Sequence, residues 1–187
     1  MNVKKYGNPV LREMCEPINE VTADIRKLAD QMVETMYDEN GIGLAAPQVG
    51  VNLRMFTIDV NFEENPVYNT PGEALLCPQM PLALINPEIT ATYGDSVEFM
   101  EGCLSVPEIN ATVYRPDRIQ LKAQILDGDM IDLECGGLLS RCVQHEIDHL
   151  DGVLFTDRAE EEDLKKVAAK LKKLENKTKK KLNSRRR

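Results

Sequence analysis

The sequence predicts an α+β fold in which a region of antiparallel strands is followed by a helix that carries the motif H-E-x-x-H. A packing helix is expected near the N-terminus and an amphipathic helix at the C-terminus. Short strand candidates with closely spaced turn signals occupy Leu82 to Leu133, which is typical of antiparallel meanders rather than βαβ units. A helical segment containing His145 and His149 follows directly, and a helix entering a β region is an α+β pattern.

The first helix is predicted from its cap and its period. Thr22 is a suitable N-cap, and Asn40-Gly41 is a suitable stop. Apolar residues between them recur at three- and four-residue steps, namely Ile25, Leu28, Met32 and Met36.

Segment 41–50 is too rich in glycine and proline to predict a regular element. Two glycines around Ile42 let a backbone approach a ligand closely, and Gln48 adds an amide donor.

The middle of the chain is predicted to be mostly β. Leu53 to Val60 reads as a strand of mixed burial. Residues 61–81 contain four prolines and are predicted to be irregular, either as a plain surface loop or as the rim of a cleft. Further strands are predicted at Leu82–Ile85, Ala111–Tyr114, Ile119–Leu126 and Met130–Leu133, and turns are predicted at residues 86–87, 94–95, 115–117 and 127–129. Gly136-Gly137 then ends the last strand before the central helix.

The last helix is predicted from Asp157, which with Glu160 resembles a capping box. Its apolar stripe consists of Leu164, Val167, Leu171 and Leu174. Beyond Leu174 basic residues dominate, so we expect that end to be frayed or disordered without a partner. The chain is thus expected to have a body, residues 1–157, and a C-terminal helix with a basic tail, residues 158–187, at the edge of the same domain.

Composition limits the class of protein. The chain has 187 residues, enough for one domain with a buried core. No run approaches the roughly eighteen apolar residues of a membrane helix, and no apolar run follows the basic N-terminus, so we expect a soluble protein that is not exported. The five cysteines lack C-x-x-C spacing, which suits reduced thiols in the cytoplasm better than a disulfide framework.

Charge is distributed unevenly along the chain. Residues 164–187 carry 12 of the 23 Lys and Arg and one acid, Glu175, a balance of +11. Residues 1–163 carry the other 11 basic residues and 30 acids, a balance of −19, which gives the net −8. An acidic body with a basic tail repels polyanions except at one end, which indicates a single localised anionic partner.

The motif at residues 144–150 predicts a metal site. It contains the chain's two histidines at positions i and i+4, which lie on one helix face about 5–6 Å apart and can reach a single ion. Glu146, beside them, can take a proton from metal-bound water and return it to a leaving group. A catalytic metal usually has a third protein ligand. Cys103 is one candidate for it, and Cys142, on the same helix face as His145, is the competitor.

Three segments resemble the peptide deformylase family, in its order and with its spacing. They are G-I-G-L-A-A-P-Q-V-G at 41–50, E-G-C-L-S-V-P at 101–107 and Q-H-E-I-D-H-L at 144–150. The resemblance implies an α+β fold in which antiparallel sheets pack around the central H-E-x-x-H helix. It also implies a metal-dependent hydrolase that removes the N-formyl group from formylmethionine at the N-terminus of newly synthesised proteins and releases formate. It implies one divalent metal ion, Fe(II) in the cell, with Zn(II), Ni(II) or Co(II) as alternatives on isolation. It also implies the bacterial cytoplasm, with an organellar matrix or stroma as the alternative.

The resemblance also implies roles for individual residues. The expected metal ligands are Cys103, His145 and His149, and Glu146 is the expected catalytic acid and base. The side-chain amide of Gln48 and the backbone N–H of Leu104 would meet the charge that develops on the formyl oxygen. Substrate would bind along Gly43 and in a methionine pocket formed by Ile42, Leu138, Cys142, Val143 and the face of His145.

Three further pairs of readings remain open at this stage. Glu101 and Arg115 could form an internal ion pair that holds the cysteine loop, or they could be surface charges. Asp148 could be a solvated acid, or it could orient a histidine or another motif. The basic tail could dock on ribosomal RNA and protein near the peptide exit, or it could be a solubilising extension.

Two other classes of protein and two departures from the family also need a decision. A zincin-type metallopeptidase would share H-E-x-x-H but usually takes a later Glu or His as its third ligand. An RNA-contacting module with a structural metal would explain the tail. Residues 61–81 look long for the family. Residues 109–111 lack the arginine that some members carry near the substrate, so the hold on downstream peptide could differ.

Overall fold

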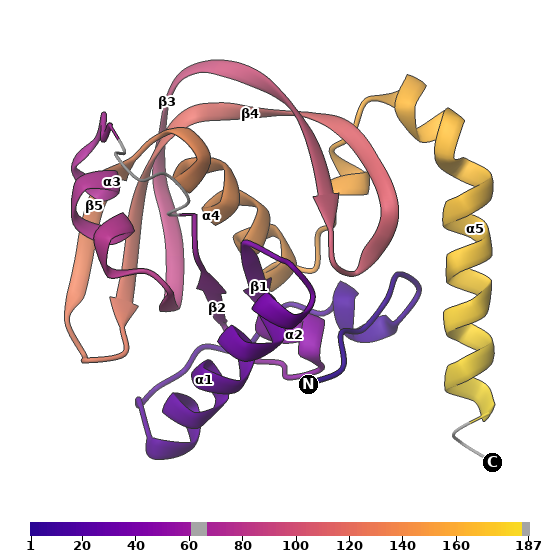
Figure 1. The fold of residues 1–187 in the computed structure, drawn as a ribbon, viewed down its shortest axis with the longest axis horizontal. Coiled ribbons are helices and arrows are strands. Elements are labelled where there is room, and N and C mark those ends of the chain that lie inside the picture. Colours follow the sequence, from indigo (N-terminus) through magenta and orange to yellow (C-terminus); the bar gives the residue numbers. More distant parts are fainter. Residues whose placement is uncertain (61–66, 185–187) are drawn as a thin grey trace.

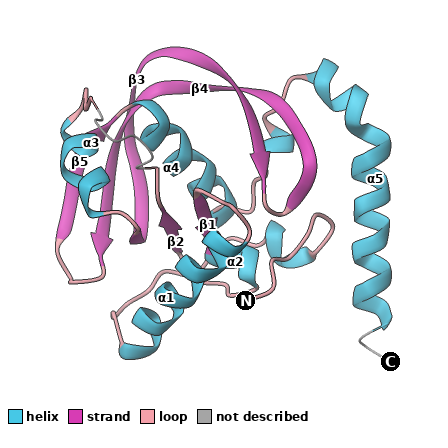
Figure 2. Ribbon diagram, in the orientation of Figure 1, coloured by secondary structure: helices cyan, strands magenta, loops and turns pink. Residues whose placement is uncertain are grey.

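The computed structural model describes residues 1–60 and 67–184, and in these ranges the predicted α+β class is confirmed (Figure 1). Five strands form one antiparallel sheet in the order β1-β2-β3-β4-β5, and these are Gly43–Ala45, Met55–Ile58, Leu82–Cys103, Val106–Ile125 and Met130–Cys135. Five α-helices accompany them, α1 to α5 in chain order, at Ala23–Asp38, Ala46–Val49, Pro71–Leu76, Gly137–Leu150 and Glu161–Ser184. Three short 3-10 helices lie at Pro9–Arg12, Cys77–Gln79 and Phe155–Asp157. The long β3-β4 hairpin arches over α4, which carries the H-E-x-x-H motif (Figure 2).

The prediction of many short strands between residues 82 and 126 was wrong. Two long strands, β3 and β4, replace them, and three of the expected turns lie inside these strands. The pairing shifts register between Ile85 and Glu88 and between Tyr93 and Ser96, where the sequence has Asn-Pro and Gly-Asp. Pro116, which was expected to lie in a turn, is inside β4 and pairs with Ser96 of β3. Turn-forming residues serve here as irregularities that bend the long hairpin around α4. The turn expected at residues 127–129 does separate β4 from β5.

Three other local predictions need correction. Segment 41–50 is regular rather than irregular, because it contains β1 and then α2, which ends at Gly50 with a φ of 88°. The strand predicted at Leu53–Val60 is shorter, and β2 is buried throughout rather than of mixed burial. Residues 67–81 contain α3, which starts with Thr70 as its N-cap and a proline in its first turn, where the missing N–H costs nothing. Residues 61–66 of the same predicted loop lie outside the described residues.

The sequence predicted helix α1 more accurately than helix α5. Helix α1 begins after Thr22, whose hydroxyl accepts a hydrogen bond from the N–H of Ile25, as expected. Asp157 is not the cap of α5, because its carboxylate accepts the N–H of Leu154 and pairs with Arg12. Helix α5 starts at Glu161 and continues past Leu174 to Ser184, where fraying was expected. Lysine is a good helix former, and Glu175 pairs with Lys179 one turn on. Residues 185–187 lie outside the described part of the chain.

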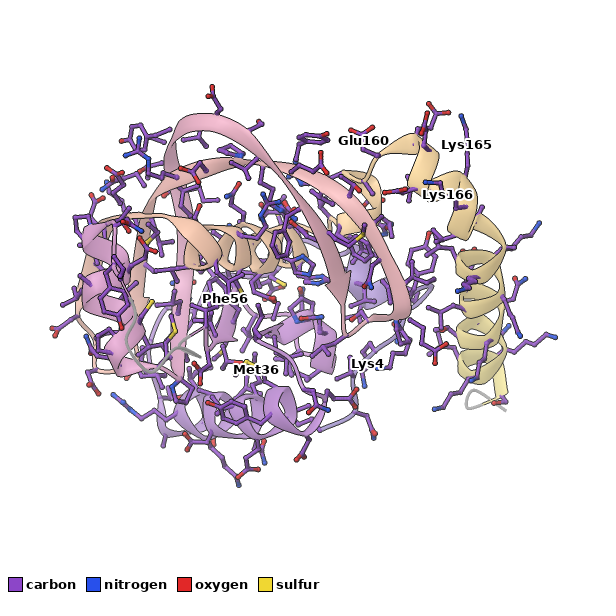
Figure 3. All side chains as sticks on the ribbon, turned by 45° about the horizontal axis from the view of Figure 1, so that its top comes forward. Lys4, Met36, Phe56, Glu160, Lys165 and Lys166 are labelled. Carbon is purple, nitrogen blue, oxygen red and sulfur yellow. The ribbon has the colours of Figure 1, made fainter. Side chains whose placement is uncertain are left out.

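The core lies on both sides of the sheet and encloses α4. Phe56 and Met36 are fully buried and point into the body of the molecule, whereas Lys165 and Lys166 project from α5 (Figure 3). The apolar stripe of α5 packs through Val167, Leu171 and Leu174 against a small cluster that includes Val113 and Phe155. No residue of α5 is buried, so this helix rests on the body rather than forming part of its core.

Candidate metal centre

Helix α4 places the two histidines and Glu146 inside the protein. His149 and Glu146 are 1% and 3% exposed. The imidazoles of His145 and His149 lie edge to face, with their centroids 5.0 Å apart, as expected for positions i and i+4 of one helix face. Helical periodicity alone is therefore enough to bring the motif's ligands together.

Cys103 completes the group from the end of β3. Its Sγ lies 3.1 Å from Nε2 of His149, and the candidate ligand atoms of Cys103, His145 and His149 all lie within 4.8 Å of one another. A thiolate with two imidazoles is a donor set that suits several first-row divalent metals. The third position of the predicted ligand set is thus occupied by a residue far from the motif in sequence.

The competing residue, Cys142, faces elsewhere. Its thiol donates to the carbonyl of Ile42 at 3.7 Å. Burial raises the pKa of the Cys142 thiol well above its usual value. Burial also acts to raise the pKa of Cys103, but the neighbouring His149 and His145 outweigh it and bring that pKa well below the usual value. Geometry and thiolate character both favour Cys103 as the ligand.

Glu101 orients one of the histidines. Its Oε2 lies 3.0 Å from Nδ1 of His145, and because an ionised carboxylate carries no hydrogen, Nδ1 is the protonated nitrogen. That tautomer leaves Nε2 of His145 with a lone pair for the metal. This contact was not predicted from the sequence. The signal was available, since Glu101 precedes Cys103 by two residues in a strand and so lies on the same face.

A buried ion-pair network holds Glu101 in turn. Arg115, 3% exposed, donates to both carboxylate oxygens of Glu101 at 2.7 and 2.9 Å, so the predicted pair is internal. Arg115 also donates to Asp148 at 2.7 Å, and Asp148 accepts two further bonds from Arg158. Burial opposes ionisation of Glu101, but its bonds to His145 and Arg115 hold its pKa well below the usual value. Asp148 therefore supports the site through Arg115 rather than by touching a histidine.

Unpaired polar atoms around the cluster fit a bound ion. Glu146 Oε2 and His149 Nδ1 are buried without a hydrogen-bond partner among the described residues. Burial raises the pKa of Glu146 to about 7, which is suited to accepting and returning a proton near neutral pH. A buried, unpaired carboxylate oxygen on the helix that carries both histidines is an arrangement that a metal and its water would satisfy.

Gln48 lies against the same cluster. Its Oε1 accepts the N–H of Ala45 at 2.7 Å, which fixes the amide so that Nε2 points toward Cys103 and Ser105. Nε2 lies 3.4 Å from Cys103 Sγ and 3.2 Å from Ser105 Oγ. Leu104, between these two residues, lines the adjoining cavity. The structure therefore brings Gln48 and Leu104, the two residues predicted to supply oxyanion donors, to the same cavity.

A cavity of about 430 Å³ opens onto Glu146 and His145. Its lining includes the predicted substrate residues Ile42, Gly43, Leu138 and Cys142. Val143 is fully buried in the core instead, because it lies on another face of α4. Other lining residues were not predicted from the sequence, among them Phe99, Met100 and Arg141.

Arg141 and Phe99 are linked at one wall of this cavity. The guanidinium carbon of Arg141 lies 5.4 Å from the centre of the Phe99 ring. Arg141 also donates to Glu101 and to the carbonyl of Val113. The stretch from Phe99 to Cys103 thus serves the site in three ways. Phe99 lines the cavity, Glu101 binds His145, and Cys103 is a candidate metal ligand.

Comparison with known proteins identifies the family. The model of the family described as polypeptide deformylase matches residues 1–176. The chain belongs to that family. Peptide deformylase 2 of Gloeobacter violaceus is 48% identical over 158 residues, which are 84% of this chain and 78% of that protein. The peptide deformylase of Desulfitobacterium hafniense is 46% identical over 157 residues, 84% of this chain and 93% of the relative.

Solved structures of deformylases agree with the fold. The peptide deformylase of Synechococcus elongatus, in complex with actinonin, superposes with a TM-score of 0.79 at 37% identity and covers 91% of this chain and 85% of that one. Plant peptide deformylase 1B gives a TM-score of 0.84 at 33% identity, and the match covers 97% of this chain and 92% of the plant chain. Family membership decides between the classes left open by the motif, in favour of a deformylase over a zincin-type peptidase or an RNA-contacting module.

None of the helices in residues 1–60 and 67–184 has both the length and the hydropathy that a membrane span requires.

Proposed function

We propose that this deformylase removes the N-formyl group from formylmethionine at the N-terminus of newly synthesised proteins and releases formate. The observation that carries the proposal is the convergence of Cys103, His145 and His149 beside the buried carboxylate of Glu146, at the end of a cavity large enough for a side chain. Family membership supports the same chemistry.

Cys103, His145 and His149 would hold one divalent ion, which we propose is Fe(II) in the cell, with Zn(II), Ni(II) or Co(II) able to replace it. When bound, such an ion lowers the pKa of water and polarises a carbonyl. The tautomer set by Glu101 and the low pKa of Cys103 both prepare the protein ligands for a cation. The donor set does not by itself select one metal.

Glu146 would move the proton during hydrolysis. Its unpaired Oε2 is buried beside the ligand cluster, so it is placed to accept a proton from the attacking water. The same carboxyl would then deliver that proton to the departing amine of the methionine. A pKa near 7 allows both steps without a large energetic penalty in either direction.

Gln48 and Leu104 would stabilise the negative charge that grows on the formyl oxygen. The Gln48 amide is held by Ala45, so its N–H needs little reorganisation to reach an oxyanion. We assign the second donor to the backbone N–H of Leu104. Loss of one such donor costs about 10²–10³ in rate in other enzymes.

The cavity would accept the methionine side chain between Ile42, Leu138 and Cys142. Gly43, in β1, lies beside Glu146, and we propose that its backbone aligns the peptide like an added strand.

The test is formate release from a formyl-Met peptide by protein purified without oxygen and loaded with Fe(II) or Ni(II). We expect robust release by the wild type and none by Glu146→Ala. Glu162→Ala is the matched control, because that acid lies in the first turn of α5 on the surface. A folded, loaded wild type that released no formate would overturn the proposal.

We also propose that the basic end of α5 docks the enzyme near the peptide exit of the ribosome, which would place the enzyme in the cytoplasm or in an organelle that translates its own proteins. The support is the +11 balance of residues 164–187 and the exposed helix that carries it beside the catalytic body of residues 1–157. Binding should weaken steeply with salt, since phosphate contacts release counterions. A variant truncated after Leu174 that bound ribosomes as well as the full chain would contradict this docking.

A further inference from the structure

The N-terminal segment joins the two sides of the metal centre. The N–H of Lys4 donates to the carbonyl of Gln48 at 2.7 Å, and the N–H of Tyr6 donates to the carbonyl of Ser105 at 2.8 Å. Residues 4–6 therefore bridge the segment that carries the Gln48 amide and the turn that follows Cys103. Lys5 lies between these two anchored residues, so its backbone position is fixed from both sides.

The side chain of Lys5 reaches a specific peptide group next to the metal ligand. Its Nζ donates to the carbonyl of Leu104 at 2.9 Å and lies 3.4 Å from Glu39 Oε2. The side chain is 31% exposed and lines the same cavity as Glu146. A charged donor on a carbonyl oxygen makes a stronger hydrogen bond than a neutral one.

The peptide group that Lys5 contacts also contacts the sulfur of Cys103. The carbonyl of Leu104 and the N–H of Ser105 belong to one planar, resonance-stabilised amide. That N–H lies 3.4 Å from Cys103 Sγ and donates to it. An ammonium ion on the oxygen end of an amide polarises the group and strengthens the hydrogen bond made by its N–H end. Ser105 is fully buried, so little solvent competes for this contact.

We propose that Lys5 is a positioning residue that acts on the metal through the Leu104–Ser105 peptide and the Cys103 thiolate. Its charge draws electron density from the sulfur, because the polarised N–H of Ser105 donates more strongly. It also fixes the turn from which the Leu104 N–H is presented to the formyl oxygen. This inference rests on the proposed metal centre, and it assigns Lys5 a part in tuning that centre rather than in binding peptide.

Lys4 provides a matched control in the same segment. Its side chain lies over Gly50, where an added Cβ would be 3.1 Å from Lys4 Nζ, and Figure 3 labels it. The described residues that line the cavity include Lys5 but not Lys4. Lys4→Met and Lys5→Met therefore make the same change in charge and size, and only the second removes the contact to Leu104.

The experiment compares Lys5→Met, Lys5→Arg and Lys4→Met in full-length protein loaded with Co(II). The energy of the thiolate-to-Co(II) charge-transfer band reports the electron density of the sulfur directly. For Lys5→Met we expect this band to move to longer wavelength and kcat to fall by up to about tenfold, with KM for a formyl-Met peptide unchanged. Lys5→Arg should restore the band and kcat in part, and Lys4→Met should match the wild type. If Lys5→Met does not fold, Lys5→Gln replaces it, because its amide is also an uncharged side chain.

Two results would overturn the inference. One is a band and a kcat for Lys5→Met that equal those of Lys4→Met. The other is an unchanged band with a raised KM, which would make Lys5 a peptide contact. Failure of the proposed function looks different from both, because loaded wild type would then release no formate while its Co(II) spectrum could still be compared among the variants.

Discussion

Oε2 of Glu101 lies 3.0 Å from Nδ1 of His145, and the same carboxylate receives two bonds from the buried guanidinium of Arg115. One acid thus fixes the tautomer of a metal ligand and neutralises an internal cation. Arg115 also binds Asp148 in α4. Its single positive charge therefore links β3, which ends in Cys103, to the helix that carries both histidines. The relative position of the three ligands depends on this network.

Arg115→Met should strongly destabilise the protein, because it leaves two buried carboxylates without their shared cation. Removing one partner of a buried ion pair typically costs about 3–5 kcal/mol in the free energy of unfolding. Urea unfolding of the metal-free protein measures the difference. Arg118→Met is the control, since Arg118 pairs with Glu134 on the surface, with side chains 45% and 31% exposed, and should cost less than about 1 kcal/mol. Equal costs for the two substitutions would show that the internal network is not a main support of the fold.

Cys103→Ala should abolish stoichiometric metal binding, whereas Cys142→Ala should retain one ion per chain. Cys103 Sγ lies 3.1 Å from His149 Nε2, while the thiol of Cys142 is bonded to the carbonyl of Ile42. Metal content after dialysis, together with the thiolate band of the Co(II) form, distinguishes the two variants. Loss of metal in Cys142→Ala with retention in Cys103→Ala would reverse the assignment of the third ligand.

The chemistry of the site was more predictable from the sequence than the shape of the fold. Two histidines four residues apart on a helix must share a face, so the motif alone places both imidazoles. Cys103 was favoured only through its surrounding motif, because spacing along the chain does not show which cysteine a sheet brings to the helix. Glu101 was linked to Arg115 correctly, but its bond to His145 depends on a tertiary contact between β3 and α4.

The errors in the fold arose where turn-forming residues lie inside regular elements. Asn86 has a φ of 48° and sits at a register shift within β3, so a local turn signal marked an irregularity in a long strand rather than its end. The family resemblance placed Val143 in the pocket together with Cys142, its neighbour in sequence. A helix turns by about 100° per residue, which directs Val143 into the core and leaves Arg141 at the cavity wall.

Gly43→Ala should reduce kcat/KM by tenfold or more, on the order expected when a catalytic group is misplaced by about 1 Å. A Cβ at position 43 would overlap Oε1 of Glu146 and would lie 2.8 Å from Cys142 Sγ. The acid and base would have to move, and the new methyl group would enter the cavity. Formate release under steady-state conditions measures the loss, and bound metal should be unchanged because no ligand is displaced. Wild-type activity in this variant would mean that Glu146 has room to relocate without cost.

The attachment of α5 to the body should weaken in acid through Asp163. Its carboxylate accepts the N–H of Thr112 at 3.1 Å and the Thr112 hydroxyl at 2.7 Å, which ties the start of the helix to β4. Hydrogen bonds from Lys166 and then Thr112 hold the pKa of Asp163 below its usual value of 3.8. A carboxyl whose pKa is lower in the folded than in the unfolded state stabilises the fold above its unfolded pKa and loses that contribution as the pH falls through the folded pKa.

Asp163→Asn isolates this contribution, because the amide keeps the size and an acceptor oxygen but cannot titrate. We expect the wild type to be more stable than Asp163→Asn at a pH of about 5, and the gap to narrow as the pH falls to about 3 and below. Urea midpoints of both proteins across that range measure the gap. Glu161→Gln is the control, since Glu161 is exposed in the same helical turn and pairs with the exposed Lys165. A gap that stayed constant with pH would mean that the charge of Asp163 does not hold α5, and the helix would then depend on its apolar contacts through Val167, Leu171 and Leu174 alone.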